Sequence, residues 1–127
     1  MAKATAELTM AASPEAVWAV VRDFHGLGTW MPGIESSRSE GDDRILGMMG
    51  MEIREHLVGI DDDGRAITYS ITEGAPVERH EATITVHDDS AGSRVTWDVE
   101  ATPDEMTGLM QGIYQQSLEA LKTHVGG

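Results

Sequence analysis

Few side chains in this sequence could do chemistry by themselves. The chain has no cysteine, which excludes a thiol nucleophile, a disulfide and a thiolate metal site. It also has no G-x-S-x-G, P-loop or H-E-x-x-H motif. Four histidines are scattered without metal-ligand spacing and are expected on the surface; they are His25, His56, His87 and His124. We therefore predict neither a metal site nor a cofactor.

General acid–base groups are the remaining candidates. Tyr69 lies in the alternating stretch RAITYSIT, in phase with Ile67 and Ile71, and His80 lies in ERHEATITVH, in phase with Ala82. A period of two places both residues on the apolar face of a strand. A histidine in such a position is more often a satisfied buried residue than a catalyst, and the pattern alone leaves both roles open.

Methionine and aromatic residues form a second distinctive group. Eight methionines occur in 127 residues, and their unbranched thioether side chains favour an adaptable pocket because they fill irregular spaces. Trp30 and Met31 lie in GLGTWMPGI, whose glycines and proline otherwise indicate a loop. Any one of these side chains would look the same in a dry core, which is the commoner role.

Length and charge limit the classes of partner. With 127 residues and 40% hydrophobic content, residues 1–127 are expected to form a single domain with one core. The net charge of −13 repels nucleic-acid phosphates and anionic membranes. Neither a signal peptide nor a membrane span is recognisable, so we expect a cytoplasmic protein without membrane insertion.

Two segments carry helix-start signals. Ser13 can cap, and Pro14 can begin, a helix of about three turns. Thr102 and Glu105 form a T-x-x-E capping box, which predicts a long helix that continues to Val125. One face of the long helix is apolar and consists of Met106, Met110, Ile113, Ser117 and Leu121, flanked by Leu109, Ala120 and Tyr114.

The back of this long helix carries a different signal. Gly108 and Gly112 form a G-x-x-x-G spacing there, which is weak evidence for a homodimer in an acidic chain. The simpler interpretation is a helix destabilised by about 1 kcal/mol per glycine.

Between the helices the apolar period is two, which predicts antiparallel strands with one wet face. The clearest strands are residues 65–72, 78–87 and 93–101, separated by turn-rich segments at 73–76 and 88–92. Further strands are predicted at residues 3–11, 34–40, 44–49 and 51–60. The apolar face of such a sheet must be covered, and the long C-terminal helix has the matching stripe. We predict an α+β fold in which the sheet curls around this helix.

The register of strand 51–60 is open, because two turn lengths fit the Asp-rich turn that follows it. A two-residue turn predicts one inner set, which is His56, Val58 and Ile60. A three-residue turn with a bulge predicts the other, which is Glu55, Leu57 and Gly59. Spacing alone does not decide between them.

The order of elements, together with SPEAVWAVVRDF, DDDGRAITYSITEG, HEATITVH and SRVTWDVEA, resembles the START-like or Bet v 1-like (SRPBCC) superfamily. The likeness is to small bacterial polyketide cyclase/dehydrase and lipid-transport-like proteins in particular, and it covers nearly the whole chain. It implies a helix-grip fold, with a seven-stranded antiparallel sheet wrapped around the long C-terminal helix and two short helices after the first strand. It also implies a deep apolar cavity between sheet and helix.

The resemblance further implies which residues line that cavity. By position it matches Glu55, Tyr69 and His80 to polar pocket residues of the plant abscisic-acid receptors, which favours the register with Glu55 inside. The lysine that holds the ligand's carboxylate in those receptors falls at Met31 here, so we expect a neutral apolar guest. The expected ligand contacts are Trp18, Trp30, Met31, Met48, Met49, Tyr69, His80, Trp97, Met106, Met110, Ile113 and Tyr114.

The family contains both carriers and enzymes, so its fold does not select a function. Our first prediction is non-enzymatic binding or transport of a small hydrophobic ligand of lipid, isoprenoid, steroid or polyketide type. The alternative is a polyketide cyclase, dehydratase or isomerase that uses Glu55, His80 and Tyr69 as acid–base groups on a ketone-bearing apolar substrate. A third interpretation is an interaction module whose loops at 46–51 and 73–77 close over a ligand and present a surface to a protein partner.

Overall fold

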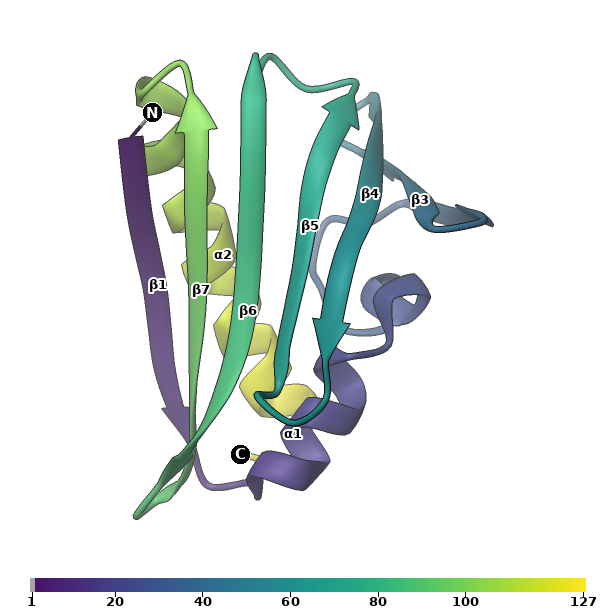
Figure 1. Ribbon diagram of the computed structural model, residues 1–127. Helices are drawn as coiled ribbons and strands as arrows, with labels where there is room; N and C mark the ends of the chain where they lie inside the picture. The colour runs from purple at the N-terminus through teal and green to yellow at the C-terminus, as the bar shows by residue number, and fades with distance from the viewer. Residues whose placement is uncertain (1) are drawn as a thin grey trace.

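The alternating stretches form one antiparallel sheet, seen face-on in Figure 1 with the long helix behind it. The computed structural model describes residues 2–127, and the seven strands lie in the order β1-β7-β6-β5-β4-β3-β2. The strands are β1 (Ala2–Met10), β2 (Ser36–Glu40), β3 (Asp43–Met48), β4 (Met51–Asp61), β5 (Ala66–Glu73), β6 (Arg79–Asp89) and β7 (Gly92–Thr102). The predicted α+β, helix-grip architecture is confirmed.

The two short helices predicted after the first strand are also present. Helix α1 spans Pro14–Val21, and the hydroxyl of Ser13 caps it by accepting a hydrogen bond from the Ala16 N–H at 3.2 Å. A 3₁₀ helix, η1, follows at Phe24–Thr29. Trp30 and Met31 come directly after η1 and are buried, so the tryptophan and methionine of the glycine-rich segment face the interior.

The long helix α2 spans Glu105–His124, but the predicted capping box at its start is wrong. Thr102 is the last residue of β7 and pairs with Arg79 across the sheet, so it lies in extended backbone before the helix. The N-cap residue is Asp104, whose side chain makes no capping hydrogen bond. Strand β7 ends later than the capping pattern suggests, because its pairing with β6 continues through Thr102.

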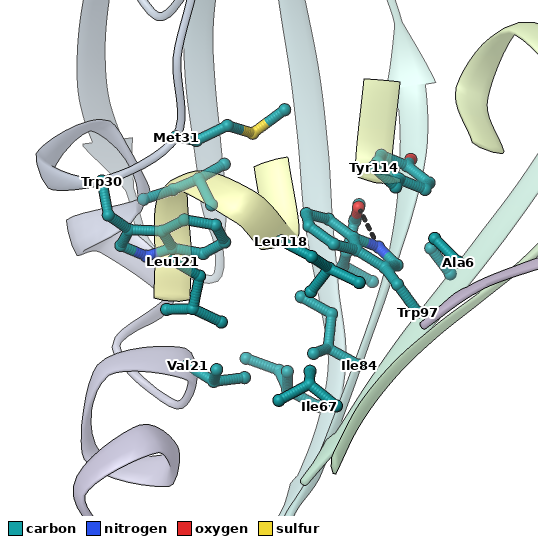
Figure 2. Packing of buried hydrophobic residues seen from close by; sticks show 14 of the residues in the cluster. Ala6, Val21, Trp30, Met31, Ile67, Ile84, Trp97, Tyr114, Leu118 and Leu121 are labelled. Atoms are coloured by element: carbon teal, nitrogen blue, oxygen red, sulfur yellow. Dashed lines mark hydrogen bonds between the residues drawn. The ribbon is translucent and has the colours of Figure 1, made fainter. Parts of the chain in front are cut away.

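The buried face of α2 packs on the inner face of the sheet around Trp97. The Tyr114 ring stacks on Trp97 with centroids 4.1 Å apart and planes 4° from parallel, and Trp30 approaches Trp97 from the η1 side at 6.1 Å (Figure 2). Leu118 is fully buried, whereas Ile113 is only partly buried. The helix is therefore rotated slightly towards Tyr114 relative to the predicted stripe.

Side chains of α2 also reach the outer edge of β1. Gln111 Nε2 donates to the carbonyl oxygen of Thr5 at 3.0 Å, and Gln115 Nε2 donates to that of Glu7 at 2.9 Å. Gln115 Oε1 also accepts a hydrogen bond from the Glu7 N–H at 3.3 Å. Backbone groups of β1 that have no neighbouring strand are thus satisfied by the helix.

The register of β4 places Glu55 and Leu57 on the inner side of the sheet. Glu55 pairs with Ile71 and Leu57 pairs with Tyr69, while a bulge between Leu57 and Gly59 leaves Val58 exposed. Asp61 pairs with Ala66, so residues 62–65 connect the strands and neither of the two turns considered above occurs. Glu55 and Leu57 thus lie inside, as the resemblance favoured, but the bulge shifts the rest of the strand by one residue. Gly59 pairs with Thr68 of the outer face and Ile60 pairs with the buried Ile67, so the expectation of Gly59 inside is wrong.

Candidate functional site

A cavity of about 190 Å³ lies between the first turns of α2 and strands β3, β4 and β5. Its walls are almost entirely apolar, and the only ionisable side chains among its lining residues within 2–127 are those of one carboxylate and two phenols. The lining residues are Leu27, Met31, Leu46, Met48, Met49, Met51, Ile53, Glu55, Tyr69, Ile71, Ala75, Pro76, Met106, Leu109, Met110, Ile113 and Tyr114. Six of the eight methionines in the chain are among them.

The cavity has an exposed mouth and a buried inner end. At the mouth, the side chains of Met49 and Leu109 are 64% and 56% exposed. At the inner end, Tyr69, Tyr114 and Glu55 are 2%, 5% and 6% exposed. A guest would therefore meet methionine and leucine on entry and reach the polar groups last.

The turn between β3 and β4 forms one side of the mouth. Met49 and Gly50 occupy it with φ angles of 52° and 72°, the pair of left-handed residues typical of a tight hairpin turn. A methionine in this region of φ is uncommon and mildly strained. The structure thus holds an apolar side chain at the mouth, in a position where Asn or Gly would be easier to accommodate.

A buried ion pair forms the inner end on the β3–β4 side. Arg44 lies opposite Glu55 in the β3–β4 register, and its Nε and Nη2 atoms contact Glu55 Oε1 at 2.8 and 2.7 Å. Nη1 donates to the carbonyl oxygen of Phe24 at 2.7 Å. The guanidinium carbon also lies 4.0 Å from the ring centroid of Phe24 and 4.8 Å from that of Tyr69. Arg44 is only 3% exposed, so its charge is neutralised locally and does not reach solvent.

The two phenols belong to a hydrogen-bonded group on the β6–β7 side. Trp97 Nε1 donates to the Tyr69 hydroxyl at 3.1 Å, and His80 Nε2 lies 3.1 Å from the Tyr114 hydroxyl. The other ring nitrogen of His80, Nδ1, accepts a hydrogen bond from the Ile71 N–H at 3.0 Å. In a neutral imidazole this leaves the proton on Nε2, so His80 donates to Tyr114.

Burial determines the protonation of this group. It lowers the pKa of His80 from 6.5 to about 4, so the ring is neutral at pH 7. Burial raises the pKa values of Tyr69 and Tyr114, which keeps both hydroxyl groups protonated. Burial also raises the pKa of Glu55, while the charge and hydrogen bond of Arg44 act in the opposite direction.

Most of the sequence-predicted site residues meet at this cavity. Those that line it are Glu55, Met31, Met48, Met49, Tyr69, Met106, Met110, Ile113 and Tyr114. Four others do not line it. Trp97 and His80 lie one layer further back, behind the phenols that they contact. Trp30 packs on Trp97, and Trp18 donates its indole N–H to Asp62 at 3.0 Å, away from the cavity.

Besides several apolar lining residues, the sequence interpretation missed Arg44, the charged residue that contacts Glu55 behind the cavity wall. An arginine in the predicted strand 44–49 is by default a solvent-facing residue, and a pocket without a cation was expected. Its pairing with Glu55 could have been found only by placing Arg44 opposite Glu55 across the β3–β4 hairpin. Among residues 2–127, no group of three histidine or acidic side chains is arranged to hold a metal ion.

Comparisons with known proteins agree with the observed fold. The family model described as "Polyketide cyclase / dehydrase and lipid transport" matches residues 1–126. The solved structure of XoxI from Bacillus cereus is 34% identical, with 98% of this chain and 96% of that chain covered and a TM-score of 0.91. A Bacillus thuringiensis protein is 32% identical, with 98% of both chains covered and a TM-score of 0.87. A Nitrosospira multiformis protein has a TM-score of 0.81 at 19% identity, covering 99% of this chain and 97% of that one, and shows the fold alone. No curated protein matches.

Proposed function

Because the chain belongs to the polyketide cyclase/dehydrase and lipid transport family, we propose that it binds a small, neutral, hydrophobic molecule in the cavity between α2 and the sheet. The observation that carries this proposal is the cavity itself, about 190 Å³ in volume and lined by six methionines and other apolar side chains. Well-packed interiors contain few voids larger than a water molecule. A space of this size with a methionine-rich wall is therefore more consistent with a guest than with a stable core.

The charges at the inner end support a neutral guest. Arg44 and Glu55 cancel one another, since the guanidinium contacts the carboxylate at 2.7 Å. A guest carboxylate would face Glu55 without a free cation, and a guest ammonium would compete with Arg44. Transfer of an unpaired charge into such a site is costly, so both classes of ion are disfavoured.

The size of the cavity limits the enclosed part of the guest. An apolar cavity of about 150 Å³ in another protein binds benzene, so about 190 Å³ holds roughly one substituted ring. A longer molecule would extend between Met49 and Leu109 into solvent or would require the mouth to open.

Extraction and titration test this proposal together. We expect organic extracts of the protein purified from native cells to contain a lipophilic compound, identified by mass spectrometry. Substituted benzenes should bind the empty protein, as measured by calorimetry or by NMR shifts. Met110→Phe, which fills the inner cavity, should weaken binding, whereas Val58→Phe, at the exposed bulge position of β4 that does not line the cavity, should not. If no compound is extracted and no apolar probe binds, the proposal is wrong.

A second candidate, an enzyme acting on a ketone-bearing substrate, has one observation in its favour. Glu55, Tyr69 and Tyr114 line the same inner end, so a base and a hydrogen-bond donor could reach one substrate carbonyl and its α-carbon. His80 would act only through Tyr114, because it does not line the cavity. If Glu55→Gln and the double variant Tyr69→Phe/Tyr114→Phe leave turnover of a candidate substrate unchanged, this mechanism is refuted.

A further inference from the structure

The inner end of the cavity presents a hydrogen-bond acceptor. Both contacts from Arg44 to Glu55 are made to Oε1. Among residues 2–127, no hydrogen bond engages Oε2, yet no buried side-chain oxygen of those residues lacks a partner. Oε2 must therefore be accessible, and Glu55 lines the cavity. A carboxylate paired with a guanidinium only accepts hydrogen bonds, so this oxygen is available for a donor on the guest.

The same inner end presents a hydrogen-bond donor. The Tyr69 oxygen already receives a hydrogen bond from Trp97, and the Tyr114 oxygen receives one from His80. The proton of each phenol must therefore be donated elsewhere. If one phenol donates to the other, the second still has a proton without a protein acceptor. Both residues line the cavity, so at least one O–H is available for an acceptor on the guest.

A hydroxyl group is the small neutral group that satisfies both demands with one atom. It donates one proton and accepts through its oxygen. A ketone or an ether would accept from the tyrosines but leave Glu55 Oε2 without a donor, and a hydrocarbon would leave both unsatisfied. A buried polar group that loses its partner reduces affinity substantially.

We propose that the natural guest is an apolar alcohol or phenol that enters hydroxyl first, donates to Glu55 Oε2, and accepts a hydrogen bond from Tyr69 or Tyr114. This assignment rests on the proposed binding function and specifies its ligand class. The apolar remainder of the guest lies among the methionines and points towards Met49 and Leu109 at the mouth. Its single polar end is the hydroxyl group at the inner end.

Three probes of similar shape test the assignment by calorimetry on the full chain. They are 4-ethylphenol; 4-ethyltoluene, which replaces the hydroxyl with a methyl group of similar size; and 4-ethylanisole, whose ether oxygen accepts but does not donate. We expect 4-ethylphenol to bind on the order of 10- to 100-fold more tightly than 4-ethyltoluene. It should also bind more tightly than 4-ethylanisole, because only the phenol can donate to Glu55.

The matched variants remove the acceptor without leaving a buried charge. Glu55→Gln alone would strand Arg44, so the test uses the double variant Arg44→Met/Glu55→Met. This variant should bind 4-ethylphenol and 4-ethylanisole with similar affinity, because both oxygens still accept from the tyrosines and Glu55 is no longer there to accept from the phenol. The control, Arg38→Met/Glu52→Met, removes an exposed ion pair with 3.1 Å contacts on the outer surface and should retain the preference for the phenol.

The outcomes separate this inference from the proposed function. If all three probes bind equally, a hydrophobic site exists but the hydroxyl is not recognised, and the inference is wrong. A preference for 4-ethylphenol over 4-ethylanisole that persists in Arg44→Met/Glu55→Met shows that the hydroxyl proton is recognised elsewhere, and it also overturns the inference. If none of the probes binds, the hydrophobic site itself fails, and this inference fails with it.

Discussion

Replacement of Arg44 by methionine should strongly destabilise the protein, and the effect should depend on pH. The substitution removes the guanidinium that contacts Glu55 Oε1 at 2.7 and 2.8 Å and the Phe24 carbonyl oxygen at 2.7 Å. Glu55 is then a carboxylate in an apolar cavity wall without its counter-charge. Breaking a buried pair in this way typically costs about 3–5 kcal/mol.

Protonation of Glu55 limits this cost and gives the sign of the pH dependence. Without Arg44, nothing opposes the effect of burial, which already raises the pKa of Glu55. A raised pKa means that the folded state binds a proton more tightly than the unfolded state. The variant is therefore most stable below the unfolded pKa of about 4.3 and loses stability as the pH rises through the folded pKa. The loss is at most about 1.4 kcal/mol per pH unit.

Urea unfolding at pH 5 and pH 8, followed by circular dichroism, measures this effect. Relative to the wild type, Arg44→Met should lose at least about 1 kcal/mol more at pH 8 than at pH 5. Arg44→Met/Glu55→Met should be more stable than the single variant, because replacing both charges with apolar groups is often well tolerated. Some cost should persist, since the Phe24 carbonyl loses its donor.

The control is an exposed pair of the same chemistry. Arg38 and Glu52 are 57% and 62% exposed, and such pairs contribute about 0–1 kcal/mol. If Arg44→Met costs no more than Arg38→Met, or if its cost is equal at both pH values, the buried ion pair described above does not exist in solution.

Three further predictions concern stability. Burial lowers the pKa of His80 from 6.5 to about 4, so between these two pH values the unfolded state binds more protons than the folded state. Up to about 3 kcal/mol of stability should therefore be lost as the pH falls from 6.5 to about 4. In acid unfolding curves, His80→Gln should reduce the dependence of stability on pH over this range. Gly74→Ala should cost about 2–4 kcal/mol in urea unfolding, because φ is +93° and an added Cβ would overlap the Glu52 carbonyl oxygen; Gly50→Ala, at φ +72° but with open space, should cost only about 1 kcal/mol. Ser13→Ala should lower stability by about 1 kcal/mol through loss of the α1 cap, and an unchanged melting temperature would argue against the cap.

The sequence predicted the fold well because its strongest signals are periodic. The alternation around Tyr69, His80 and Trp97 identified three strands and their inner faces, and Ser13 with Pro14 identified the start of α1. Thr102 shows the limit of such local patterns. The four-residue capping signal placed it at the start of the helix, but the long-range pairing of β6 with β7 keeps it in a strand.

The site was less predictable, because its polar end depends on contacts between distant segments. Glu55 and Arg44 are joined by a hairpin register, and Phe24, from the first quarter of the chain, accepts a hydrogen bond from the same arginine. No spacing rule connects these three residues. Conversely, Trp18 and Trp30 are of a residue type common in apolar pockets, but they do not line this one. The Trp18 indole donates to Asp62, and the Trp30 ring packs on Trp97. A homodimer and a cytoplasmic location stay predictions.

The hydrogen bonds from glutamines of α2 to β1 should help to prevent aggregation of this protein at high concentration. A free sheet edge is a template on which another chain can add a strand and begin to aggregate. Gln111 and Gln115 occupy the hydrogen-bonding groups of Thr5 and Glu7 that an incoming strand would need. The opposite edge, β2, is short, fully exposed and carries Arg38 and Glu40, features that discourage strand addition. Pairing of strands between molecules is therefore hindered at both edges of the sheet.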